Sequence, residues 1–270
     1  MKLLVCGSAG FLMSNFMRYL MYRSKDYEII SVDKLIHPED FKRVYLNKNH
    51  RFYIGDVSNE YFMDRLIYIE KPNYIINGIG HLSFEPDKME LHRKTILDSI
   101  FTLSKYNIPV IQLASEFDIQ FEKIFSKNGP MLILPNCFGF RQRSTVGLAK
   151  VINDIINSNE PIITSTKKLP WVFAEDVASF IWYIIEKNII ETVKMPPLGF
   201  MDTKTMVEMI FRILNKNTKI KVIPYVGGNE VYPIKPFQDW VPDSLSLENS
   251  IEKTTNWFKN NKWALGGVYI

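Results

Sequence analysis

A glycine-containing turn directly after a short apolar run is the clearest chemical signal in the sequence. The run Leu3–Cys6 has the pattern of a buried strand, and Gly7 and Gly10 follow it before a segment of helical periodicity. In such an arrangement the backbone N–H groups at the start of the helix, here those of Phe11 and Leu12, receive the pyrophosphate of a dinucleotide. The turn therefore predicts a dinucleotide-binding site.

Carboxylates at the ends of the next two predicted strands support this interpretation. Asp33 lies roughly twenty residues beyond the turn, where an acidic residue accepts hydrogen bonds from the adenosine ribose. Its charge would repel a 2′-phosphate, so the pattern favours NAD over NADP. Asp56 and Val57 follow a third strand, and a carboxylate beside an apolar residue there is placed to hold the adenine edge.

One position departs from the glycine pattern. Met13 occupies the third glycine position, where glycine normally lets the helix lie close against the strand. A thioether there either tilts the helix or packs under it. A plain strand-to-helix turn without a cofactor is the alternative interpretation of the whole segment.

Strands and helices alternate strictly along the first 135 residues, which predicts an α/β fold with a doubly wound parallel sheet, a Rossmann fold. The expected strands are Leu3–Cys6, Ile29–Val32, Phe52–Ile54, Tyr74–Ile76, Val110–Leu113 and Met131–Leu134, and the expected helices are Gly10–Arg23, Asn59–Glu70 and Glu90–Tyr106. From about residue 145 the elements become shorter and mixed. They include an expected helix over Thr203–Asn215 that Asp202 could cap, a strand over Lys219–Pro224 and a final helix near Leu245–Asn260. We expect a dinucleotide-binding domain over residues 1–145 and a smaller mixed lobe over 146–270, with the chain crossing back to the first domain near 160–190.

Composition excludes several classes of protein. The chain of 270 residues is 46% hydrophobic and 23% charged, which is typical of a folded globular protein and not of a disordered one. The net charge of +4 is spread along the chain without a basic stripe, so we expect no nucleic-acid partner. No apolar run reaches the roughly 18 residues of a membrane span. Cys6 and Cys137 have no metal-ligand spacing, so we expect no metal, buried reduced cysteines and a cytoplasmic location.

Seven segments carry motifs that occur together, and in this order, in one family. They are Val5–Phe16, Val32–Leu35, Gly55–Val57, Lys71–Asn77, Asn136–Gln142, Trp171–Val177 and Ser246–Thr254 with Trp257–Phe258. Together they resemble the NAD-dependent epimerase/dehydratase family of extended short-chain dehydrogenases/reductases, and within it most the nucleotide-sugar 4,6-dehydratases. The resemblance covers nearly the full chain and implies NAD as cofactor and a nucleotide sugar as ligand.

The resemblance also implies roles for individual residues. Lys34 and Leu35 would meet the adenosine ribose, Ile79 and Gly80 would lie beside the nicotinamide, and Asn136 would lie between the cofactor and substrate sites. An oligomer is compatible with the sequence. The usual dimer interface is not expected, because the segment in which relatives form it is shortened here.

Family chemistry would begin with hydride transfer from sugar C4 to NAD, using a tyrosine base, a lysine and an orienting hydroxyl, before a carboxylate pair eliminates water. The resemblance makes Ser115 the orienting hydroxyl and Glu116 the acid. Phe117 takes the place of the second carboxylate, and only Asp118 is near enough to substitute for it. No tyrosine lies between Ser115 and Met131.

Two hypotheses follow from these matches and gaps. In the first, the protein is an NAD-dependent enzyme related to nucleotide-sugar dehydratases and epimerases, with Ser115 and Glu116 retained and its other acid/base groups rearranged. In the second, it is a non-catalytic NAD-binding subunit that regulates or scaffolds a sugar-nucleotide pathway. The only Tyr-xxx-Lys spacing, from Tyr183 to Lys187, falls in the other lobe, and we interpret it as coincidental.

Overall fold

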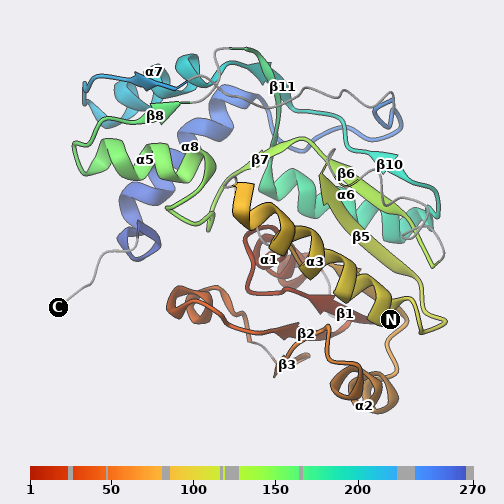
Figure 1. The fold of residues 1–270 in the computed structure, drawn as a ribbon. Coiled ribbons are helices and arrows are strands. Elements are labelled where there is room, and N and C mark those ends of the chain that lie inside the picture. The colour runs from red at the N-terminus through yellow and green to blue at the C-terminus, as the bar shows by residue number, and fades with distance from the viewer. Residues whose placement is uncertain are drawn as a thin grey trace.

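A parallel sheet forms the centre of the larger part of the molecule (Figure 1). The computed structural model describes residues 1–23, 27–46, 48–80, 86–115, 118, 128–163, 167–223 and 235–265. Within these ranges the sheet has seven strands, and every neighbouring pair is parallel. Their order across the sheet is β10 (Val193–Lys194), β6 (Met131–Leu134), β5 (Val110–Ser115), β4 (Tyr74–Asn77), β1 (Lys2–Cys6), β2 (Glu28–Asp33) and β3 (His50–Ile54).

Helices cover both faces of this sheet, which explains why its inner strands are apolar on both sides. On one face, α1 (Phe11–Arg23) and α6 (Ala174–Lys187) pack on residues such as Leu3 and Val5. On the other face, α2 (Glu60–Glu70) packs on residues such as Leu4 and Cys6, and α3 (Pro86–Leu103) lies on the same side. Because successive strand residues point to opposite faces, β1 alone contributes to both cores. The doubly wound α/β fold is confirmed.

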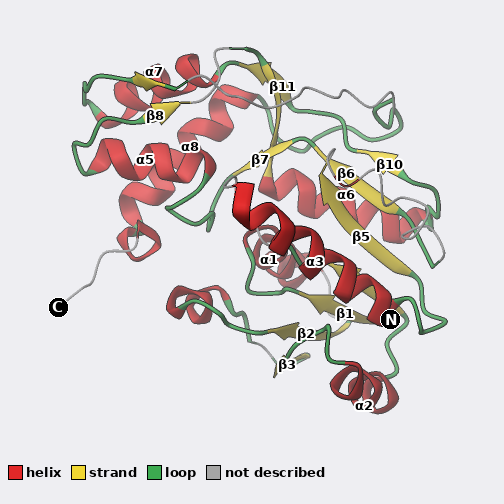
Figure 2. Ribbon diagram, viewed as in Figure 1, coloured by secondary structure: helices red, strands yellow, loops and turns green. Residues whose placement is uncertain are grey.

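A second, smaller core lies above the carboxyl ends of the large sheet in the view of Figure 1. Its described elements are a three-stranded sheet, a two-stranded sheet and three helices, and Figure 2 shows that helices predominate. The strands are β7 (Asn136–Phe138), β9 (Leu169–Phe173), β11 (Gly199–Met201), β8 (Ile162–Ile163) and β12 (Lys221–Val222), and the helices are α5 (Gly147–Ile156), α7 (Thr203–Leu214) and α8 (Leu247–Asn260). The smaller mixed lobe is thus present, while α6 and β10 belong to the layers of the large sheet. The boundary at residue 145 stays a prediction.

Capping residues explain where two helices of the smaller lobe begin. Asp202 accepts a hydrogen bond from Thr205 N at 2.9 Å and starts α7, as an acidic N-cap should. Ser246 accepts one from Asn249 N at 3.1 Å and starts α8. Both helices were expected from the sequence within two residues of these bounds.

Some expectations about local structure were wrong. The third helix of the first domain covers Pro86–Leu103 instead of Glu90–Tyr106, and the strand expected over 219–224 is only Lys221–Val222. Short β7, β9, β10 and β11 were not anticipated, because strands of two to five residues show no clear periodicity. Cys6 is buried as expected, but Cys137 is only partly buried.

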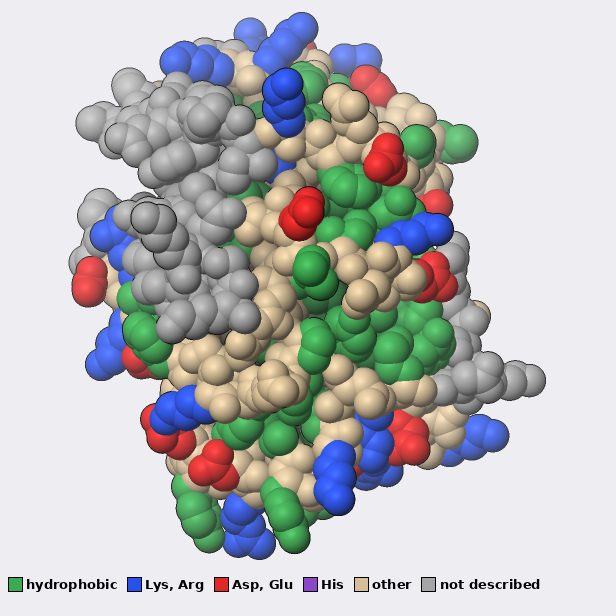
Figure 3. All heavy atoms as spheres, turned by 90° about the vertical axis from the view of Figure 1, so that its right-hand side faces the viewer, with side chains coloured by type: hydrophobic (Ala, Val, Ile, Leu, Met, Phe, Trp, Pro, Cys, Tyr) green, Lys and Arg blue, Asp and Glu red, His purple; other side chains and the backbone are tan. Residues whose placement is uncertain are grey.

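The described surface carries charges of both signs. On the face shown in Figure 3, basic and acidic side chains are interspersed. None of the helices described here combines the length and apolar character that a membrane span requires.

Candidate active site

The site lies where the carboxyl ends of the parallel strands meet. Strand order reverses between β1 and β4, because β2 and β3 continue to one side of β1 and β4, β5 and β6 to the other. Ligands of doubly wound sheets bind at such a switch point. The turns that follow β1 and β4 touch there, since a Cβ at Gly7 would lie 3.2 Å from the backbone of Gly78.

The turn after β1 has the conformation that its glycines require. Gly7 has φ +73°, and a Cβ on Gly10 would lie 2.9 Å from the carbonyl oxygen of Gly7. Gly10 N–H donates to that same oxygen at 2.9 Å, which closes the turn. α1 then begins at Phe11, so the N–H groups of Phe11 and Leu12 have no acceptor within the helix and face the end of β1.

Met13 packs under α1 at the position where the pattern has its third glycine. Its side chain is 1% exposed, and a Cβ at Gly78 would lie 2.3 Å from Met13 Cγ. The space that a glycine on the helix normally provides is therefore provided by a glycine at the end of β4. Of the two possibilities that the sequence left open, the thioether packs under the helix.

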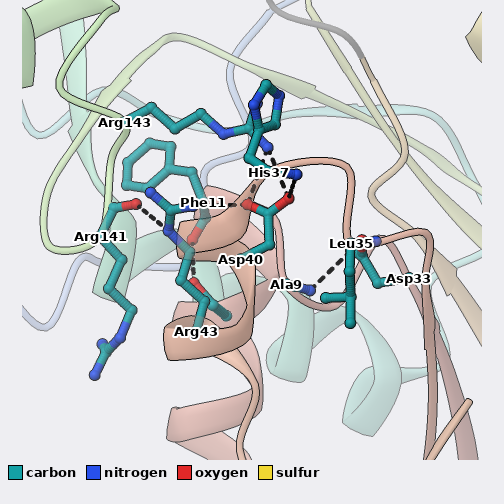
Figure 4. Close-up of polar contacts among 10 residues, drawn as sticks. Ala9, Phe11, Asp33, Leu35, His37, Asp40, Arg43, Arg141 and Arg143 are labelled. Carbon is teal, nitrogen blue, oxygen red and sulfur yellow. Dashed lines mark hydrogen bonds and ion pairs between the residues drawn. The ribbon is translucent and has the colours of Figure 1, made fainter. Parts of the chain in front are cut away.

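Asp33 is held by the glycine turn itself (Figure 4). Its Oδ2 accepts a hydrogen bond from Ala9 N at 2.9 Å, and its Oδ1 accepts one from Leu35 N at 2.8 Å. Partial burial raises the pKa of Asp33, and these two backbone donors oppose the rise. A carboxylate oxygen has two lone pairs, so each oxygen can accept one further hydrogen bond, such as one from a ribose hydroxyl.

The residues after β2 and β3 form an ion pair. Lys34 Nζ lies 2.5 Å from Asp56 Oδ2, and Asp56 Oδ1 accepts hydrogen bonds from Ser58 N at 2.9 Å and Ser58 Oγ at 2.7 Å. Burial alone would raise the pKa of Asp56, but these donors hold it below its ordinary value. Val57, next to Asp56 in the chain, is buried. The structure thus brings Lys34 and Asp56 together at the ends of β2 and β3.

A second set of contacts lies at the end of β5. Ser115 Oγ donates to Asp118 Oδ2 at 2.6 Å, and Ser115 N donates to the same oxygen at 2.7 Å. Asp118 is 3% exposed, whereas Ser115 is half-buried. Glu116 and Phe117 lie outside the described residues. The serine expected from the sequence is therefore bonded to the carboxylate that could replace the missing one.

Sequence reasoning missed a buried amide network that supports this edge of the sheet. Asn77 Nδ2 donates to Gln112 Oε1 at 2.7 Å and to Ser99 Oγ at 3.0 Å, and Asn77 Oδ1 accepts from Ile79 N at 3.3 Å. Asn77 thereby contacts the backbone of Ile79 in the segment that follows β4. A polar residue at the end of an apolar strand was the available signal, because a buried amide must find partners.

Two other candidates have defined surroundings. Asn136 is exposed, and its Nδ2 donates to Pro170 O at 3.1 Å, which leaves its Oδ1 as an acceptor. Tyr183 lies on α6, where its hydroxyl donates to Asp239 O at 3.2 Å and its ring stacks on Phe180. The contacts of Tyr183 are those of a packing residue.

A cluster of two buried arginines and one partly exposed arginine lies near Asp33 and was also missed. Arg43, in the 3₁₀ helix η1 (Pro38–Arg43), is 1% exposed, and its Nη1 donates to Asp40 Oδ1 at 2.8 Å. Its Nε donates to Arg141 O at 3.0 Å, and Arg143 Nη2 donates to Asp40 Oδ1 at 3.1 Å (Figure 4). These contacts join the segment after β2 to the turn after β7.

Comparison with known proteins gives a family match for part of the chain. Residues 3–104 match the model of the NAD dependent epimerase/dehydratase family. Over 70 residues the chain is 40% identical to the Low-salt glycan biosynthesis protein Agl12 of Haloferax volcanii. The aligned segment covers 25% of this chain and only 22% of that relative.

Solved structures match over almost the full length. A dTDP-glucose 4,6-dehydratase from Bacillus anthracis, in complex with NAD, has a TM-score of 0.83 at 18% identity and covers 98% of both chains. A UDP-glucose 4-epimerase from Thermotoga maritima, with UDP-glucose, has a TM-score of 0.79 at 19% identity and covers 97% of this chain and 100% of its own. At such identities the likeness shows a shared fold.

Proposed function

We propose that the whole chain is a member of the NAD-dependent epimerase/dehydratase family, whose model matches residues 3–104, and that it binds NAD and a nucleotide sugar. The observation that carries the proposal is Asp33. Its carboxylate is fixed by Ala9 N of the glycine turn and by Leu35 N, and it retains acceptor capacity on both oxygens.

The residues of the first domain fit the parts of NAD. The N–H groups at the start of α1 suit its pyrophosphate, since a helix N-terminus favours an anion. Asp33 and Leu35 would hold the adenosine ribose, and Lys34, Asp56 and Val57 would hold the adenine. Ile79, whose N–H donates to Asn77, and Gly80 would line the nicotinamide side. When bound, NAD supplies an acceptor for a hydride from a sugar alcohol.

A nucleotide sugar is the best-supported second ligand. Both structural neighbours described above carry sugar-nucleotide names, and the relative from Haloferax volcanii is named for glycan biosynthesis. In this chain Asn136 follows β6, whose end is paired with Ser115 of β5, so the two side chains border the same edge of the sheet. We propose that Asn136 and Ser115 contact the sugar, and that Glu116 acts as an acid.

Thermal unfolding with added dinucleotide tests cofactor binding. A ligand present at 100 times its Kd stabilises a protein by about 2.7 kcal/mol, which raises the unfolding midpoint by a few degrees. We expect a shift with NAD and a smaller one with NADP, because Asp33 repels a 2′-phosphate. Absence of a shift with both dinucleotides would contradict the proposal. Calorimetric titration with dTDP- and UDP-hexoses then identifies the nucleotide.

A non-catalytic subunit is the second candidate function. The observation that favours it is the absence of any tyrosine in the sequence between Ser115 and Met131, where the resemblance places the base. Such a subunit would bind NAD and the sugar nucleotide but form no keto product. Product formation above a blank, abolished by Ser115→Ala, would exclude it.

A further inference from the structure

We propose that Ser115 and Asp118 form a hydroxyl–carboxylate pair that removes the proton of a sugar alcohol, in place of the tyrosine that is missing between Ser115 and Met131. The inference rests on the proposed function, because it needs the alcohol of a bound nucleotide sugar. It assigns Asp118 a role in proton transfer through Ser115, whose oxygen is the atom that contacts the substrate.

The direction of the hydrogen bond supports this role. A serine hydroxyl has one proton, and Ser115 Oγ donates it to Asp118 Oδ2, with the two oxygens 2.6 Å apart. The free lone pairs of Ser115 Oγ can therefore only accept, and the natural partner is an alcohol that donates. Hydrogen bonds to a carboxylate are short and strong, so a buried Asp118 holds the pair in one orientation.

The pair is also in the right part of the sheet. Ser115 is the last residue of β5 and is half-buried, whereas Asp118 is 3% exposed. β5 is the neighbour of β4, whose end continues into Gly78 and Ile79 at the switch point. An alcohol that contacts Ser115 would thus lie on the nicotinamide side of the glycine turn.

The proposed step balances with a nicotinamide dinucleotide as the oxidant. The C–H and O–H bonds of one secondary alcohol break, and the hydride leaves the carbon with its electron pair for the dinucleotide. The electron pair of the O–H bond forms the C=O bond. The alcohol proton passes to Ser115 Oγ as the proton of Ser115 passes to Asp118 Oδ2. The alcohol becomes a ketone, the dinucleotide is reduced, and Asp118 becomes neutral.

A purely structural role is the competing explanation, and the chain contains a matched example of it. Asp202 accepts from Thr205 N at 2.9 Å and from Thr205 Oγ1 at 2.7 Å, so it has the same two kinds of donor three residues away, although these donors follow it in the chain and those of Asp118 precede it. That contact caps α7 in the smaller lobe. Asp202→Asn therefore measures what the loss of such a carboxylate costs in stability alone.

The experiment compares Asp118→Asn, Ser115→Ala and Asp202→Asn with the wild type by three measurements. They are the unfolding midpoint, the Kd of the nucleotide sugar without dinucleotide, and the single-turnover rate of dinucleotide reduction. We expect Asp118→Asn to lower that rate by about 10²–10⁴-fold, the contribution of a positioned proton-transfer group, while the Kd rises by no more than about tenfold. Asp202→Asn should leave the rate unchanged.

A binding measurement without cofactor gives a second test. The wild type should bind the sugar nucleotide about tenfold more tightly than its 4-deoxy analogue, because Ser115 Oγ accepts from the hydroxyl. Ser115→Ala should remove this preference. In Asp118→Asn the amide can donate to Ser115 and free the serine proton, so the preference should shrink.

The outcomes separate this inference from the proposed function. A wild-type rate in Asp118→Asn would overturn the inference, as would a preference for the hydroxyl that is unchanged in Ser115→Ala. Either result would leave the proposed function intact. Binding of NAD and sugar nucleotide by a wild type that reduces no dinucleotide would also overturn it, and would support the non-catalytic subunit. Failure to bind either ligand would instead remove the proposed function.

Discussion

Among single residues, Asp33 is the one to which we assign the proposed preference for NAD, because it joins the glycine turn to the end of β2. Asp33→Asn should weaken NAD binding by about 10- to 100-fold, since a hydrogen bond to a charged acceptor contributes roughly 1.5–3 kcal/mol. The difference between NAD and NADP should shrink at the same time, because the repelling charge is gone. Calorimetric titration with both dinucleotides measures this.

The matched control for Asp33 is Asp64→Asn. Asp64 also accepts a hydrogen bond, from Tyr106 Oη at 2.7 Å, but it lies on α2 and away from the glycine turn. Its variant should bind NAD as the wild type does. Equal affinities of Asp33→Asn and the wild type would contradict the proposed ribose contact.

The contact between Gly78 and Met13 gives a second prediction about single residues. The Met13 side chain fills the space that a side chain at position 78 would need. Gly78→Ala should destabilise the protein by about 1–3 kcal/mol, because its Cβ would lie 2.3 Å from Met13 Cγ. In a Met13→Ala background the same substitution should cost little. Urea unfolding of the wild type, the two single variants and the double variant gives the coupling energy between the two positions. Equal costs of Gly78→Ala in both backgrounds would contradict the contact.

At the level of elements, the first turn of α6 contains a carboxylate that is not exposed. Asp176 Oδ1 accepts from Ser244 N at 3.0 Å, and burial raises the pKa of Asp176 to about 6. A raised folded-state pKa means that this carboxyl stabilises the fold most at low pH, and that the contribution is lost as the pH rises from about 4 through 6.

Asp176→Asn should therefore be more stable than the wild type at neutral pH. The neutral amide keeps an oxygen for Ser244 N and avoids the buried charge, a gain of at most about 3 kcal/mol that should disappear toward pH 4. Urea unfolding across this pH range measures it. Asp202→Asn should instead be less stable than the wild type at neutral pH, because the Thr205 donors lower the pKa of Asp202 and stabilise its charged form. A wild type more stable than Asp176→Asn at pH 7 would refute the prediction.

Periodicity and turn chemistry allowed most elements of the large sheet to be predicted. Met131–Leu134 and the start of α7 after Asp202 follow from local sequence, since an apolar run and an N-cap act within a few residues. The strands β7, β9 and β11 could not be predicted, because three to five residues form a strand there only through tertiary pairing. The same limit applies to the site. Gly7, Gly10 and Asp33 form a local pattern, whereas the contact of Gly78 with Met13 is visible only in three dimensions.

Across the whole molecule, buried charge joins the large sheet to the turn that leads into the smaller lobe. Asp40 is 2% exposed and pairs with Arg43, whose Nε in turn donates to Arg141 O. Asp40→Asn should cost about 3–5 kcal/mol, because it leaves the buried Arg43 guanidinium without its counter-charge.

Arg143→Ala is the matched comparison for that prediction. Arg143 pairs with the same carboxylate, but its side chain is one-third exposed, so its loss should cost no more than about 1 kcal/mol. Guanidinium chloride unfolding of both variants checks the ranking. A larger cost for Arg143→Ala than for Asp40→Asn would contradict the greater contribution that we assign to the buried pair.

The contact between Met13 and Gly78 also constrains how such a sequence can evolve. Clearance between α1 and the end of β4 depends on the summed volume of two positions, so the glycine can stand at either one. Relatives with glycine at the position of Met13 are then free to carry a side chain at the position of Gly78, and the two columns of an alignment should covary. A lineage that moves from one state to the other must pass through the pair in which both residues are small, because the pair in which both are large does not fit. A sequence search that requires three glycines in the first turn would therefore overlook proteins that, like this one, have a large residue at the position of Met13 and glycine at the position of Gly78.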